Sequence, residues 1–198
     1  MDELLDSEGN LQAPSEMDGM RGTNFVVGDR WLREHGHYAQ YWEALPEPTR
    51  AIVRTVDVSS WLPMSVALPH YRALDALPLS YEDRIAFGAS VSQSVNGVVL
   101  STVARLAGSI GLSPFVPLAR AAKLFARNFR GGAVGVTKVG ATEARFEVLG
   151  TPLAVSACHR DNIGGALLDG TRTFAADVRV TEIATRRTPT SYAFRIRW

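Results

Sequence analysis

The sequence predicts an α+β protein in which a helical N-terminal half packs on a four-stranded antiparallel sheet. Apolar residues recur at helical spacing over most of residues 29–130, whereas four later segments alternate apolar and polar residues with period two. One helical segment separates these strands into two pairs, which gives the order β-β-α-β-β. Because the strands form one block of the chain, they favour an antiparallel sheet over alternating βαβ units.

The first 22 of the 198 residues differ in composition from the remainder. Residues 1–20 contain six acidic side chains and no basic one, with glycine and proline scattered among them. We therefore predict a disordered acidic tail over residues 1–22 and a single domain over residues 23–198. Beyond residue 20 the chain has 21 basic and 14 acidic side chains, a net charge of about +7. The tail is either solvated or folded back over a basic surface, where it would compete with an anionic partner.

Five helical segments are predicted in the N-terminal half. The first is interrupted near Gly36, and the fourth begins at a capping box formed by Ser80 and Asp83. Pro69 lies at an early position of the third, and residues 58–64 are expected to form a loop. The predicted segments are 29–45, 49–56, 69–77, 81–107 and 113–130.

The helix predicted over residues 81–107 carries a face of small residues. Such a face lets a second helix approach closely, either within the domain or across a dimer, or it forms one wall of a pocket. The residues of this face are Ala86, Ser90, Ser94, Gly97, Ser101 and Ala104.

Two hairpins are predicted in the C-terminal third, one on either side of a helix over residues 152–170. The helix is weakened by a Gly-Gly pair at residues 164–165. In the last strand one face is apolar and buried, and the opposite face is solvated. The apolar face consists of Tyr192, Phe194, Ile196 and Trp198, and the hairpin strands cover residues 132–140, 142–150, 173–184 and 191–198.

Composition excludes several classes of function. The one cysteine, Cys158, rules out an internal disulfide and a multi-cysteine zinc site, and it is expected to be a small buried hydrophobe. The four histidines show no metal-binding spacing, and nucleotide-binding and catalytic motifs are absent, so we predict that the chain is not an enzyme. No apolar segment is long enough to span a membrane, and the acidic N-terminus is not a secretory signal. We expect a cytoplasmic protein that binds no nucleic acid.

Several short motifs together resemble a known family. In chain order they are WEALPEPTRAIV, SSWLPM, RLAGSIGLSP, ARAAKLFARNFRGG, FEVLGTPL and the terminal FRIRW. Over about residues 25–198 the chain resembles the myxobacterial family DUF2378. That family is similar to 4-vinyl-reductase-like domains, haem-nitric-oxide-binding domains and TRAPP subunits. The resemblance implies helices on one face of a twisted antiparallel sheet, often a dimer, and often an apolar cavity for a hydrophobic ligand.

The chain departs from this family before its final strand. Relatives commonly carry a cysteine-rich turn there, approximately Cys-x-x-x-Gly-Asp-x-x-Cys. The corresponding positions are Ala184 and Tyr192, with Thr188 and Pro189 in place of Gly-Asp. Because both thiols are absent, no metal or redox role of theirs carries over, and no histidine of this chain matches a haem-ligand motif.

These observations favour a non-enzymatic sensory or ligand-binding domain, predicted to be homodimeric, that binds a hydrophobic small molecule in an apolar pocket. No metal site is expected and the sequence requires no cofactor. Haem is a less favoured alternative, with His70 as its first candidate axial ligand. The candidate pocket residues are Trp61, His70, Phe87, Phe115 and Phe125.

The alternative function is a protein–protein interaction or scaffold module without a ligand. A basic stripe on the helix predicted over residues 113–130 would supply its partner surface, although such a stripe is also typical of a solvated helix face. The stripe consists of Arg120, Lys123, Arg127 and Arg130.

Overall fold

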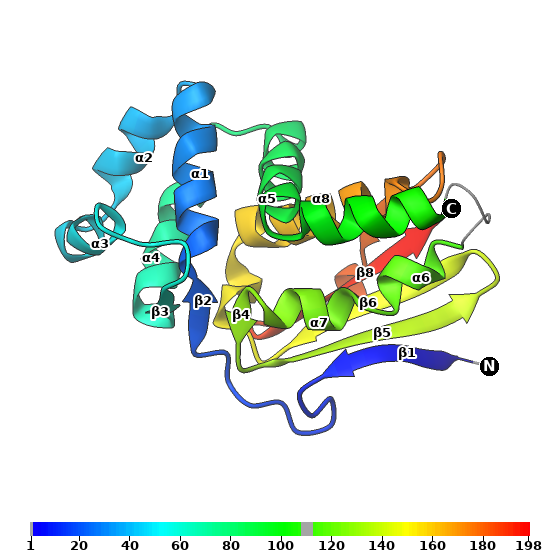
Figure 1. Cartoon of the computed structure of the whole chain (residues 1–198). Coiled ribbons are helices and arrows are strands. Elements are labelled where there is room, and N and C mark those ends of the chain that lie inside the picture. Colours follow the sequence, from blue (N-terminus) through cyan, green and yellow to red (C-terminus); the bar gives the residue numbers. More distant parts are fainter. Residues whose placement is uncertain (1, 108–112) are drawn as a thin grey trace.

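Helices and antiparallel strands segregate in the structure, which confirms the predicted α+β fold. The computed structural model describes residues 2–107 and 113–198, with the backbone alone for residues 95–107. Helices α1–α4 gather at one end of the molecule, beside the short strands β2 and β3 (Figure 1). Helices α7 and α8 contact the larger sheet, and α5 packs against α8. The N-terminal half contains α1 (Gly22–Glu34), α2 (Tyr38–Ala44), α3 (Glu47–Val53), α4 (Met64–Asp75), α5 (Tyr81–Ala107), α6 (Phe115–Leu118) and α7 (Ala121–Ala126).

The described residues form two antiparallel sheets. The larger has the order β1-β5-β6-β8-β7, and the smaller has the order β3-β2-β4. The larger sheet contains β1 (Glu3–Glu8), β5 (Ala133–Gly140), β6 (Glu143–Leu149), β7 (Arg179–Glu182) and β8 (Ser191–Arg197). The smaller contains β2 (Gly19–Arg21), β3 (Trp61–Pro63) and β4 (Phe129–Arg130). The helix between the hairpins is α8 (Ala157–Arg172), preceded by the 3-10 turn Pro152–Val155.

The prediction of a disordered tail over residues 1–22 is wrong, and the main sheet has a fifth strand as a result. Strand β1 pairs antiparallel with β5, and β2 joins β3 to β4. The acidic composition conceals apolar residues that become buried: Met17 and Met20 are in the core, and Leu11 covers Gly135. Burial of these side chains, together with the strand hydrogen bonds, offsets the entropy lost on ordering the segment.

The segment does fold back over basic groups, as one of the two interpretations proposed. Asp2 pairs with Arg145 at 3.3 Å, and Asp18 pairs with Arg130 at 2.6 Å. The Asp6 carboxylate accepts a 3.0 Å hydrogen bond from the backbone N–H of Ala122 in α7. These contacts connect the acidic segment to α7, β4 and β6.

The N-terminal helices follow the predicted order with shifted boundaries. The first predicted segment is divided into α1 and α2 at Gly36, whose φ of 77° is left-handed. Helix α4 begins at Met64, so Pro69 lies inside it rather than near its start. Residues Trp61–Pro63, expected to be part of a loop, form β3 because β2 pairs with them.

The fourth predicted helix, α5, has the predicted bounds. Its capping box is formed: the Asp83 backbone N–H donates to Ser80 Oγ at 3.1 Å, and the Ser80 N–H donates to Asp83 Oδ2 at 3.0 Å. Of the three roles left open for its small-residue face, packing within the domain does not apply to Ala86 and Ser94, which are exposed. The side chains of Gly97, Ser101 and Ala104 lie outside the described part.

A different pair of glycines brings α5 and α8 together. A Cβ at Gly165 of α8 would lie 2.1 Å from the Ile85 carbonyl oxygen, and one at Gly88 of α5 would lie 2.0 Å from that of Asn162. Glycine is therefore required at the contact on both helices. The Gly-Gly pair that weakens α8 as an isolated helix is thus what allows its tertiary packing.

The segment over residues 113–130 is not one helix. It forms α6, then α7 after Arg120 leaves the helical conformation at φ −131° and ψ 1°, and then the short strand β4. The first-turn amide of Ala122 is satisfied by Asp6 from β1, a partner that local sequence does not reveal. The predicted stripe of four basic residues is therefore divided between α7, its two ends and β4.

The C-terminal strand confirms the predicted alternation except at Ala193, which lies on the face expected to be solvated but is buried. Tyr192, Phe194 and Ile196 are buried, while Arg195 and Arg197 are exposed and pair with Glu143 at 3.1 and 2.6 Å. No helix among the described residues is long and apolar enough to cross a membrane.

The α5–α8 contact generates a stability prediction. Replacement Gly165→Ala places a methyl group against the backbone of Ile85 and is expected to lower the free energy of unfolding by about 1–3 kcal/mol. Gly140→Ala is the matched control, since its added Cβ would meet no atom closer than 3.7 Å. Urea denaturation of both variants measures the difference, and equal stabilities would contradict the proposed close contact.

Candidate ligand pocket

A pocket of about 110 Å³ lies where α5, α7 and α8 meet β6. Its walls are mainly apolar, and α1 and α4 contribute one side chain each. Of the five candidate residues predicted from the sequence, only Phe125 is part of its wall. The large apolar wall residues are Val91, Leu118, Leu124, Phe125, Phe129, Phe146, Ile163 and Leu167.

Three phenylalanines form the aromatic part of the wall. The rings of Phe125 in α7 and Phe129 in β4 stack with centroids 4.4 Å apart, and Phe146 in β6 lies 6.1 Å from Phe125. Offset stacking of this kind adds specific packing energy to the burial of the rings. The aromatic corner is thereby held between the sheet and α7.

Asparagines supply most of the polar groups in the wall. The Asn24 amide nitrogen donates to the Arg21 carbonyl at 3.1 Å and to Asn128 Oδ1 at 3.5 Å. Asn128 Nδ2 in turn donates to the Leu124 carbonyl at 3.3 Å. The Asn162 amide nitrogen donates to the carbonyls of Arg84 and Cys158 at 2.8 and 3.0 Å, which ties α8 to α5.

These asparagines were missed by the sequence analysis. They come from α1, the end of α7 and α8, and they lie on no shared local pattern. The sequence offered one signal for them, an asparagine within a predicted helix that also contains buried apolar residues, as at Asn162. A buried amide there needs several hydrogen bonds and therefore partners from other elements.

The other aromatic candidates lie in separate parts of the core. Phe87 packs edge-on against Trp31 at 5.4 Å, and Phe115 packs against Trp198 at 4.7 Å. Trp61 lies on β3 with the Arg21 guanidinium 4.5 Å above its ring. Phe87 and Phe115 were expected on helices and Trp61 in a loop, and such local patterns do not specify which element each side chain meets.

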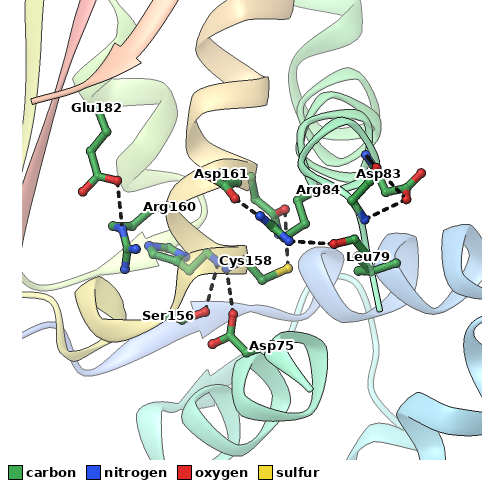
Figure 2. Close-up of polar contacts among 12 residues, drawn as sticks. Asp75, Leu79, Asp83, Arg84, Ser156, Cys158, Arg160, Asp161 and Glu182 are labelled. Carbon is green, nitrogen blue, oxygen red and sulfur yellow. Dashed lines mark hydrogen bonds and ion pairs between the residues drawn. The ribbon is translucent and has the colours of Figure 1, made fainter. Parts of the chain in front are cut away.

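The first turn of α8 is attached to three other elements (Figure 2). The Cys158 backbone N–H donates to the Asp75 carboxylate of α4 at 2.8 Å, and Arg84 of α5 pairs with Asp161 at 2.6 Å. Arg160 pairs with Glu182 of β7 at 3.2 Å. These contacts fix the end of α8 from which Asn162 and the following wall residues extend.

Cys158 is fully buried, as predicted. Burial, with Asp75 nearby, raises the pKa of its thiol well above the ordinary value. A protonated, enclosed thiol is a poor nucleophile and a poor metal ligand. Cys158 therefore acts as a packing residue.

Two histidines are completely enclosed in aromatic surroundings beside the pocket. His70 Nδ1 shares a 2.7 Å hydrogen bond with the Tyr41 hydroxyl, and His159 Nε2 shares a 2.9 Å hydrogen bond with the Tyr192 hydroxyl. The Tyr71 ring lies between the imidazoles, with its centroid 5.0 and 4.9 Å from theirs. The second ring nitrogen of each histidine has no partner among the residues that the structure describes. Burial lowers the pKa of both histidines to about 3, so both are neutral near pH 7.

Comparison with solved structures shows that the fold is that of H-NOX (haem-nitric-oxide-binding) domains. The Fe(II) unliganded H-NOX protein from K. algicida matches with a TM-score of 0.59 and 13% identity, covering 90% of this chain and 96% of that one. An oxygen-binding H-NOX domain related to soluble guanylate cyclases matches with a TM-score of 0.57 and 12% identity, covering 90% and 94%. A third, from work on haem distortion in the H-NOX family, has a TM-score of 0.53 and 14% identity, covering 90% and 95%. No family model and no curated protein matches the chain.

The pocket does not fit haem. An iron porphyrin needs an axial ligand such as histidine, and none of the four histidines of the chain is part of the pocket wall. His70 and His159 are enclosed as described, His35 stacks on Trp31 at 3.8 Å, and His37 is the N-cap residue of α2. The volume of about 110 Å³ is also below the roughly 300–1,000 Å³ typical of cofactor and drug sites.

The expectation of His70 as an axial ligand is therefore not supported by its position. Elsewhere in the part of the chain that the structure describes, no group of three or more His, Cys, Asp or Glu side chains is placed to hold a metal ion.

The buried histidines generate a pH prediction. In the unfolded chain an imidazole titrates near pH 6.5, whereas in the fold the pKa of His159 is about 3. Between these values the unfolded state binds more protons, so the free energy of unfolding falls as the pH falls, by about 1.4 kcal/mol per pH unit for each such histidine. His159→Phe is expected to make this slope shallower by about that amount between pH 6.0 and 5.0, measured by chemical denaturation.

Tyr192→Phe provides the control for this measurement, because it removes the hydroxyl that pairs with His159 and keeps the buried imidazole. Its slope should equal that of the unmodified protein, since the ring of His159 stays enclosed. His159→Phe also removes the partner of Tyr192, so its overall stability is lower and only the slope is diagnostic. A slope equal to that of the unmodified protein would contradict the assignment of a neutral buried imidazole.

Proposed function

We propose that the chain is a non-enzymatic sensory or ligand-binding domain that takes up a small hydrophobic molecule directly in the pocket between α5, α7 and α8. The observation that carries the proposal is an apolar pocket, in an H-NOX-like fold, whose wall has no group suited to hold haem. We also propose that the chain is related to the DUF2378 family, and only the sequence motifs support that relationship.

The size of the pocket supports a ligand of about one ring. An apolar cavity of about 150 Å³ engineered in another protein stays dry and binds benzene or xenon. The present pocket, at about 110 Å³, has walls of the same chemical type. It suits a molecule of about the size of a single aromatic ring.

The titratable groups around the pocket support binding without catalysis. Burial raises the pKa of Tyr71, which is part of the wall, and that of Cys158 behind it. His159 is neutral but is not part of the wall. General acid–base catalysis needs a group with a pKa near the working pH within reach of the substrate, and these residues do not meet that requirement.

Homodimerisation remains part of the proposal. It is supported by the small residues that α5 leaves exposed at Ala86 and Ser94, which would let a second helix approach closely. Light scattering on the purified protein is expected to give twice the mass of the 198-residue chain, and Ala86→Arg is expected to give the single-chain mass. A monomeric unmodified protein would contradict this part.

The second candidate function is a protein interaction module. It is favoured by Arg120, Lys123 and Arg127, which are exposed and make no ion pair with any described residue. Arg130, the fourth member of the predicted stripe, pairs instead with Asp18. An acidic partner would find three cations within a single short helix and its ends.

A pocket-filling substitution tests the main proposal. Ala166 of α8 is part of the pocket wall, and Ala166→Leu should occupy the space and reduce the affinity for toluene by at least about tenfold. The matched control is Ala157→Leu, at an exposed position of the same helix. Isothermal titration calorimetry gives the affinities, and a saturating ligand should raise the melting temperature of the unmodified protein and of the control. Equal toluene binding by both variants would contradict the proposed location.

A further inference from the structure

Asn24 and Ser92 each bring to the pocket wall a polar side-chain atom that has no hydrogen bond to a described residue. Asn24 and Ser92 are 5% and 7% exposed, and both are part of the wall. The Asn24 amide nitrogen is committed to Arg21 and Asn128, but its Oδ1 accepts no hydrogen bond from any described residue. Ser92 Oγ likewise neither donates nor accepts within the described part of the chain. A nearly buried polar atom left without a partner costs free energy unless a ligand or a water molecule satisfies it.

Three other polar side chains of the wall contrast with these two, and the hydroxyl of a fourth, Tyr71, interacts with the Asn162 amide. The Asn128 amide accepts from Asn24 and donates to Leu124, and the Asn162 amide donates to the Arg84 carbonyl of α5 and to the Cys158 carbonyl of its own helix. The Thr171 hydroxyl donates to the Leu167 carbonyl at 2.7 Å. The atoms open to a ligand are therefore an amide oxygen, which only accepts, and a hydroxyl, which both donates and accepts.

The wall also determines the charge of the ligand. No lysine, arginine, histidine, aspartate or glutamate is among its described residues. An ionised ligand would lose its hydration without gaining a counter-charge, which is far more costly than burying a neutral polar group. A carboxylate or an ammonium group is thus excluded by the same surroundings that favour an apolar body.

We propose that this pocket selects a small neutral molecule, about one ring in size and largely apolar, that carries one hydroxyl or N–H group, and that Asn24 and Ser92 bind that group. The ligand's O–H or N–H donates to Asn24 Oδ1, and Ser92 Oγ donates to the ligand oxygen or accepts a second proton from it. The phenylalanine and aliphatic side chains of the wall contact the apolar body. The inference rests on the proposed function, because it names the ligand class of the same pocket.

A matched pair of probes tests the inference. Phenol and toluene have nearly the same shape and differ in a hydroxyl against a methyl group. In the unmodified protein the ratio of phenol affinity to toluene affinity is set partly by the two open atoms. Ser92→Ala and Asn24→Leu each remove one of them, and each is expected to lower that ratio by about tenfold, measured by calorimetry. Benzoate, the charged analogue, is expected not to bind.

Controls separate this inference from the proposed function and from misfolding. Ser90→Ala alters a hydroxyl on the same helix that is not part of the wall, so its ratio should equal that of the unmodified protein. Asn24→Leu also removes bonds to Arg21 and Asn128, and if it fails to fold then Ser92→Ala decides the outcome. An unchanged ratio in Ser92→Ala, with toluene still bound, would overturn the inference and leave the proposed function intact. Binding of benzoate at a comparable affinity would also overturn it, and absence of binding by both toluene and phenol would overturn the proposed function itself.

Discussion

The close contact between α5 and α8 is the constraint on which the rest of the structure depends. Backbone meets backbone at Gly88 and Gly165, where an added methyl group would lie about 2 Å from a carbonyl oxygen. Asn162 bonds across the same contact to the Arg84 carbonyl, and Arg84 pairs with Asp161 beside it. Since α8 also contacts the sheet, its distance from α5 determines where the pocket walls lie.

Hydrogen bonds and ion pairs surround this contact and hold the elements that meet there. The first turn of α8 is bonded to α4, α5 and β7, so one end of the pocket is supported from three directions. Beside it, Tyr71 separates two neutral imidazoles, each of which is bonded to a tyrosine hydroxyl. Groups that sequence reasoning associates with metal binding or catalysis are thus used to pack and orient helices.

The elements predicted correctly are those whose signals are local. The bounds of α5 follow from a capping box at Ser80 and Asp83, and the last strand follows from the alternation that buries Tyr192, Phe194 and Ile196. The strand β1 could not be predicted in this way, because its pairing with β5 and the Asp6–Ala122 bond join residues more than a hundred positions apart. The first turn of α7, which follows the break at Arg120, donates a hydrogen bond to that same distant carboxylate.

An apolar pocket could be predicted from the sequence, but most of the residues that form its wall could not. An aromatic-rich apolar pocket was expected, and Phe125 is part of it, but the other four candidates lie elsewhere. Its polar residues belong to α1, α4, α5, α8 and the end of α7, and only the tertiary fold brings them together. The same holds for the haem alternative: whether His70 faces a cavity is a property of packing, and it is enclosed by Tyr41, Tyr71 and Phe25 instead.

The central claim is that a small apolar molecule enters the space between α7, α8 and β6 without a cofactor. Xenon is a suitable probe because it binds dry apolar cavities of this size through dispersion forces alone. A crystal of the protein pressurised with xenon is expected to show an ordered xenon atom in contact with Phe125, Phe146 and Leu167. A crystal in which the protein's own side chains fill this space, and in which no xenon binds there, would contradict the account.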